Sequence, residues 1–116
     1  MKSIFTNNLK KCYITGNDKN VHIHHIFGAA NKKNCEKYGF IIPLTDIYHN
    51  MSDNSIHFNK EWDLEIKLKC QEYWTMTLHR SEDEFISIFG RWWMPENDLI
   101  YSKKKQKLGF NRQIRR

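Results

Sequence analysis

Histidines are the residues of this chain best suited to chemistry. Five of the six lie between positions 22 and 57, and two of them, His24 and His25, are adjacent. Imidazole is the commonest metal ligand among protein side chains and a base that works near neutral pH. Successive side chains of a strand point to opposite faces, so adjacent histidines on a strand do not easily bind one ion together. The pair therefore suits two roles, one metal ligand and one general base.

Later histidines complete a set that could surround an ion. His49 and His57 follow the adjacent pair along the chain. Two or three converging imidazoles with open coordination positions would leave room for a phosphate oxygen and a water molecule. Alternation places His22 on the same face as His24, where it could add a ligand, but a surface role is favoured for it.

Short strands and a short helix are expected to position these histidines. Residues 11–14 predict a strand that turns and returns as a second strand over 21–27, where apolar and polar residues alternate. Residues 40–44 predict a further short strand. Thr45 is a suitable N-cap for a short helix that runs through His49.

The second half of the chain predicts two helices that serve as scaffold. Residues 60–78 contain no Gly or Pro, and large apolar side chains recur there at helical spacing. Ser81 and Glu84 form a capping box for another helix, which Gly90 is placed to end. Short strands combined with helices indicate an α+β fold. The apolar face of the longer helix is expected to consist of Trp62, Ile66, Cys70 and Trp74.

Length and charge indicate one domain with a basic tail. Residues 1–98 hold 12 basic and 13 acidic side chains, whereas residues 99–116 hold seven basic and no acidic ones. We expect a single domain over 1–98, with a core over about 10–59 and helical support over 60–90. The tail either contacts a phosphate backbone or solubilises the chain.

The cysteines and the hydropathy pattern exclude several classes of protein. The three cysteines are scattered without a CxxC pair, which argues against an extracellular disulfide framework and a cysteine-rich zinc knuckle. No run of about 18 apolar residues is present, so no membrane association is expected. The expected location is the cytoplasm.

Residues 21–59, with their His-His-Ile and His-Asn elements, resemble the ββα-metal (His-Me) finger of HNH endonucleases. The likeness is to the compact versions encoded by phages and prophages, including RecA-dependent recombination-enhancing nucleases. It extends over about residues 10–91 and includes the segment SEDEFISIFG. The resemblance implies a β-hairpin and a short helix that hold a metal, packed on two or three further helices, in the cytoplasm of a host cell.

The resemblance also implies a role for each histidine. The first residue of the pair binds the metal in this family, which falls on His24, and the second deprotonates the attacking water, which falls on His25. His49 matches the second metal ligand. A further ligand often follows within a turn or two, for which His57 is the first choice and Asp53 the alternative.

Asn50, next to His49, is a candidate to orient groups by hydrogen bonding. Two departures from the family pattern carry further expectations. The family's middle Asn falls on Gly39-Phe40 here, so a backbone carbonyl is expected to orient the base instead. Many members hold the finger with a structural zinc between two CxxC pairs. Only Cys12 survives at those positions, so no structural zinc is expected, and packing of Ile14, Ile23, Ile41 and Tyr48 would replace it.

The function implied is hydrolysis of DNA phosphodiester bonds with one divalent metal ion, which could be Mg, Mn, Zn, Ni or Co. Besides DNA, recombination proteins or phage machinery are candidate partners, and the protein would act as a monomer or homodimer. Two alternatives stay open: a degenerate finger that binds metal and DNA without cutting, and a protein in which histidines bind zinc only to fold the chain. The expected DNA contacts are Lys32, Lys33, Lys103, Lys104, Lys105, Lys107 and Arg112.

Trp92 and Trp93 follow the second helix directly. They could stack on an unpaired base or dock the tail on the body. Docking is the favoured interpretation, because large aromatic side chains usually pack.

Overall fold

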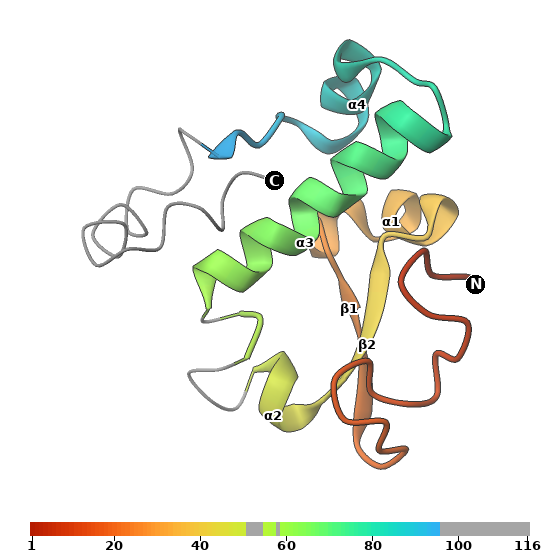
Figure 1. Ribbon diagram of the computed structural model, residues 1–116, viewed down its shortest axis with the longest axis vertical. Helices are drawn as coiled ribbons and strands as arrows, with labels where there is room; N and C mark the ends of the chain where they lie inside the picture. Colours follow the sequence, from red (N-terminus) through yellow and green to blue (C-terminus); the bar gives the residue numbers. More distant parts are fainter. Residues whose placement is uncertain (51–54, 58, 96–116) are drawn as a thin grey trace.

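Two short strands and four α-helices form the part of the chain that the structure describes. The structure is a computed structural model, and it describes residues 1–50, 55–57 and 59–95. It is a small mixed α+β fold, as the sequence predicts (Figure 1). Within these residues no helix is long and apolar enough to cross a membrane. In chain order the elements are β1 (Val21–His25), α1 (Lys32–Tyr38), β2 (Ile41–Thr45), α2 (Asp46–His49), α3 (Lys60–Glu72) and α4 (Glu82–Phe89).

The sheet is an antiparallel pair of β1 and β2, with His24 opposite Ile42 and Ile23 opposite Pro43. Pro43 interrupts no bond to β1, because its backbone faces the outer edge of β2. There its carbonyl accepts a hydrogen bond from the Tyr13 amide at 2.8 Å. An edge position is where proline is tolerated in a sheet.

The strand expected over residues 11–14 does not form, so that prediction is wrong. The segment folds back on itself instead: the Gly16 amide donates to the Cys12 carbonyl, and the Cys12 amide donates to the Asn17 carbonyl, both at 2.8 Å. These local bonds use the backbone groups that a strand ladder would need. The partner of β1 is therefore β2, which follows it in the chain.

Helix α1 lies in the connection between the two strands. It follows a 3₁₀ turn at Ala29–Asn31 and ends at Gly39, whose φ is +81°. A Cβ at position 39 would lie 3.0 Å from Ile4 Cγ2, so the glycine also lets the N-terminal segment pack closely. The Ile4 amide donates to the Gly39 carbonyl at 2.9 Å, which fastens that segment to the end of α1.

The long helix expected over 60–78 is α-helical through Glu72 and continues as a π-helical stretch over Tyr73–Thr77. The Thr75 hydroxyl donates to the Gln71 carbonyl at 3.2 Å, competing for an acceptor of the α-helical ladder. The expected apolar face is confirmed for Ile66, Cys70 and Trp74, which are buried. Trp62 is half-buried and packs on Tyr48 with ring centroids 6.4 Å apart.

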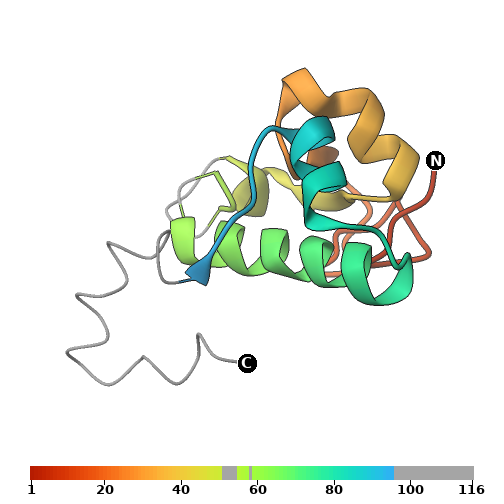
Figure 2. The same ribbon diagram turned by 90° about the horizontal axis from the view of Figure 1, so that it is seen from above.

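The core lies between the strands, α1, α3 and α4. Figures 1 and 2 show α3 crossing the sheet, with α1 and α4 near its C-terminal end and α2 near its N-terminal end. The largest side chains that are fully buried are those of Trp74, Phe40, Phe85, Ile41, Ile42, Leu44 and Ile56.

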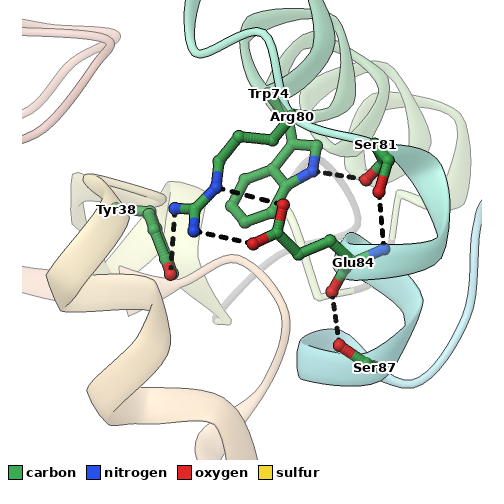
Figure 3. Close-up of polar contacts among 6 residues, drawn as sticks. All are labelled: Tyr38, Trp74, Arg80, Ser81, Glu84 and Ser87. Atoms are coloured by element: carbon green, nitrogen blue, oxygen red, sulfur yellow. Dashed lines mark hydrogen bonds and ion pairs between the residues drawn. The ribbon is translucent and has the colours of Figure 1, made fainter.

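A group of polar contacts ties α1, the segment between α3 and α4, and α4 together (Figure 3). The Arg80 guanidinium donates twice to the Glu84 carboxylate, at 3.2 and 2.7 Å, and once to the Tyr38 hydroxyl at 3.3 Å. It lies over the Trp74 ring, 4.9 Å from the centroid. The Trp74 indole N–H donates to the Ser81 carbonyl at 2.8 Å. We call Tyr38, Trp74, Arg80, Ser81 and Glu84 the helical centre.

The N-cap and C-cap of α4 are those that the sequence predicts. Ser81 Oγ accepts a hydrogen bond from the Glu84 amide at 3.1 Å, and Gly90 ends the helix with a φ of +98°. The Glu84 carboxylate pairs with Arg80 instead of returning to the cap, so the capping box is formed on one side.

Candidate metal centre

Three imidazoles from separate segments converge and lie close enough to bind one metal ion. They are His24 on β1, His49 at the end of α2, and His57, and we call them the histidine cluster. One ligand atom from each lies within 4.8 Å of the others. The Nε2 atoms of His49 and His57 are 3.1 Å apart.

The local fold explains why these three side chains meet. Helix α2 begins directly after β2, which pairs with β1, so His49 lies one helical turn beyond the strand that faces His24. The segment that carries His57 returns along α2: the Ile56 amide donates to the Tyr48 carbonyl at 2.8 Å, and the His57 amide donates to the His49 carbonyl at 3.4 Å. Backbone bonds therefore hold all three positions.

The donor set fits a transition-metal ion. Two nitrogen ligands of a tetrahedral Zn²⁺, each about 2.0–2.1 Å from the ion, would lie about 3.3 Å apart. The separation between His49 and His57 is close to that. His24 gives independent support, since its side chain is only 7% exposed and its Nε2 has no hydrogen-bond partner in the structure. A buried unpaired nitrogen costs about 1–3 kcal/mol, and a bound ion would satisfy it.

Burial and neighbouring charges favour the neutral form of two imidazoles of the cluster. Burial, together with the nearby His57 and His49, lowers the pKa of His24 to about 3. Burial and the neighbouring His57 also lower the pKa of His49. Both imidazoles are therefore neutral near pH 7, which is the form that binds metals.

His25 lies outside the histidine cluster, and its Nε2 contacts a carboxylate. The Nε2 atom is 2.8 Å from Glu36 Oε2, and this hydrogen bond is the largest influence that lowers the pKa of Glu36. The sequence led us to expect a backbone carbonyl in this place, and the structure corrects that expectation. Glu36 was missed because it belongs to α1, 11 residues after His25, and no spacing pattern connects the two positions.

A cleft of about 570 Å³ joins His25 to the histidine cluster. Another part of its lining comes from α3, to which the sequence assigned no chemistry, and from the segment after α4. The charged and aromatic residues of that wall are Lys60, Asp63, Lys67 and Trp93.

Other expected site residues lie elsewhere. Asn50 is exposed at the C-cap of α2 and is not among the residues that line the cleft. Lys32 and Lys33 are exposed at the start of α1, also outside the lining. His22 pairs with Asp46 and stacks on His49 with ring centroids 5.5 Å apart, so it borders the cluster from an exposed position.

Some expected residues lie outside the described part of the chain. Asp53, the alternative metal ligand, is one of them. The others belong to the basic tail, together with the expected domain boundary at residue 98: Lys103, Lys104, Lys105, Lys107 and Arg112.

Cys12 contacts the hydroxyl groups of Thr15 and Thr45, which occupy the positions where a finger with a structural zinc would have further cysteines. Thr45 Oγ1 donates to its Sγ at 3.7 Å. Burial raises the pKa of Cys12, but hydrogen bonds from Thr15, Thr45 and Ile14 outweigh it and bring the pKa down to about 7. Ile14 is 44% exposed, so it does not take part in the apolar packing expected to replace a zinc.

No protein-family model, curated protein or solved structure matches the chain. Its function is therefore argued from the site itself.

Proposed function

We propose that this protein is a metal-dependent DNA endonuclease of the HNH type, in which β1, β2 and α2 form the ββα-metal finger. The observation that carries the proposal is a three-histidine cluster beside a fourth imidazole, with all four lining one cleft. Three ligands leave coordination positions open for substrate, which distinguishes catalytic from structural metal sites.

His24, His49 and His57 would hold the ion. When bound, a divalent ion supplies positive charge that stabilises the charge developing on phosphorus and on the departing 3′-oxygen. Imidazole nitrogens suit Zn²⁺, Ni²⁺, Co²⁺ or Mn²⁺ better than Mg²⁺, which prefers oxygen ligands. Because the buried His24 is neutral near pH 7, no proton has to leave it before the ion binds.

His25 is the proposed general base. Its Nε2–H donates to the Glu36 carboxylate, which fixes the tautomer and leaves Nδ1 with a free electron pair. Nδ1 takes a proton from the water that attacks phosphorus, and Glu36 stabilises the imidazolium that results. Glu36 is thus a positioning residue, acting through His25.

The substrate is the DNA phosphodiester backbone. Lys32 and Lys33 lie exposed on α1, the helix that also carries Glu36, and would contact phosphates outside the cleft. Such contacts position the duplex and carry no sequence information.

Nicking of supercoiled plasmid in a panel of divalent metals tests the proposal. The expected result is nicked circles with at least one metal, and a loss of about 10²- to 10⁴-fold in rate for His25→Ala with unchanged metal affinity. His79→Asn is a matched control, because His79 is exposed with a φ of +56°, a conformation that Asn tolerates. A His25→Ala variant that nicks as fast as the parent would refute the role of His25. Metal binding and DNA binding without nicking would favour a degenerate finger.

A further inference from the structure

One stripe of α3 forms a wall of the cleft that the histidine cluster also lines. Lys60, Asp63 and Lys67 are spaced at i, i+3 and i+7, which places them on the same face of the helix, and all three line the cleft. Two buried residues of α3 flank this stripe, Leu64 at i+4 from Lys60 and Cys70 at i+3 from Lys67. The charged stripe therefore lies on the inward-facing side of α3, at the part of that side that lines the cleft.

Lys67 is held in place within this wall. Its side chain is only 17% exposed, and its Nζ lies 2.7 Å from Asp63 Oδ2. The same ammonium lies 4.9 Å from the centroid of the Trp93 ring. The charge of Lys67 also reaches His24, where it contributes to lowering the pKa of that imidazole.

Trp93 is itself held in place by Gln71 of α3. Gln71 is buried, and its side-chain amide makes two hydrogen bonds to the backbone of Trp93: Nε2 donates to the carbonyl at 3.0 Å, and Oε1 accepts from the amide at 2.8 Å. The Trp93 ring packs on Phe27 with centroids 5.1 Å apart. Trp93 thus belongs to the body of the fold and shapes the cleft beside Lys67.

We propose that Lys60 and Lys67 bind the DNA phosphate backbone, so that the strand lies between this face of α3 and the histidine cluster. The proposal rests on the function proposed above and adds the second wall of its substrate site. Seven residues of helix separate the two lysines by about 10 Å along the axis, so they contact different phosphates. Asp63 keeps the Lys67 ammonium directed into the cleft, while its own charge repels the strand.

Metal-free DNA binding isolates this inference from catalysis. Fluorescence anisotropy of a labelled duplex, titrated with the full-length protein in EDTA, is expected to show about tenfold weaker binding for Lys67→Gln at 0.1 M salt. The slope of log affinity against log salt should fall by about one. Lys69→Gln is the matched control, because Lys69 is an exposed lysine of the same helix outside the cleft lining, and it should change affinity far less.

Two more variants separate phosphate contact from helix stabilisation. Lys67→Arg keeps the charge and should retain the affinity of the parent. Asp63→Asn removes a charge that repels the strand, so binding should be unchanged or stronger. If the Asp63–Lys67 pair only stabilises the helix, Asp63→Asn and Lys67→Gln should weaken DNA binding equally. Circular dichroism confirms that each variant is folded.

The outcomes distinguish this inference from the proposed function. Parental affinity for Lys67→Gln, or equal losses for Lys67→Gln and Lys69→Gln, would overturn the phosphate wall even if the parent nicks plasmid. If the parent nicks plasmid with none of the metals in the panel, but its DNA binding depends on Lys67, the proposed phosphate contacts stand and the proposed nuclease activity is refuted.

Discussion

The helical centre and the histidine cluster are both polar groupings at the junction of several elements, yet they differ in how their polar atoms are paired. In the helical centre, Arg80 meets Glu84 and Tyr38, and the Trp74 indole meets the Ser81 carbonyl. In the histidine cluster, His24 is more deeply buried than Arg80, and its Nε2 has no hydrogen-bond partner. The first arrangement pairs its own polar atoms, whereas the second contains a buried nitrogen that a bound ion would satisfy.

Helix α1 connects the two regions. Tyr38 near its end contacts Arg80, and Glu36 one half-turn earlier contacts His25. The helical centre thereby fixes the helix that carries Glu36, the carboxylate in contact with His25 beside the histidine cluster. Changes in the helical centre should therefore alter stability first, and changes around the cluster should alter ligand binding or activity first.

The largest expected loss of stability comes from Trp74→Ala. Trp74 is fully buried and its indole N–H is hydrogen-bonded, so truncation should lower the free energy of unfolding by about 3–5 kcal/mol. Urea denaturation in EDTA measures it. A loss below about 1 kcal/mol would show that the helical centre does not hold the fold together.

His24→Leu should have opposite effects with and without metal. In EDTA the variant removes a buried unpaired nitrogen and fills the space with an apolar side chain, so the free energy of unfolding should rise by about 1–3 kcal/mol. With excess Zn²⁺ the parent should gain stability and the variant should not. Denaturation under both conditions measures the difference, and a variant that is destabilised in EDTA would contradict the account.

Glu36→Ala should slow nicking by about 10- to 100-fold without changing metal affinity, because it removes the group that orients His25. Glu36→Gln should restore part of the rate, since its amide oxygen can still accept the hydrogen bond. Single-turnover nicking rates and metal titrations measure the two effects. If the alanine and glutamine variants are equally slow, orientation by Glu36 is not what the rate depends on.

Lowering the pH should destabilise the metal-free protein. The pKa of His24 is about 3 in the folded chain and about 6.5 when unfolded, so the unfolded chain binds more protons between these values. The contribution is fully present above pH 6.5, and below it the free energy of unfolding should fall by about 1.4 kcal/mol per pH unit. Denaturation at pH 7.5, 6 and 5 should show a shallower decline for His24→Leu. Equal slopes would contradict a buried neutral His24.

The sequence predicts those features that depend on local spacing. The caps of α4, the buried face of α3 and the division of His24 from His25 follow from periodicity and turn chemistry, and the structure has them. The partner of β1 was mistaken, because pairing depends on which distant segment leaves its backbone groups available. Glu36 and Lys67 were missed for the same reason. Glu36 contacts His25 from another element, and Lys67 lines the same cleft as the histidines, and neither relation can be seen from spacing along the chain.

Calorimetric titration of the metal-free protein with Zn²⁺ and Co²⁺ tests the central claim most directly. One ion per chain is expected for the parent and for His22→Gln, since His22 only borders the cluster. His49→Ala and His57→Ala should each bind about 100-fold more weakly or worse, because each removes a direct ligand. A parent that binds no ion, or alanine variants that bind as tightly as the parent, would contradict the claim that these histidines form a metal site.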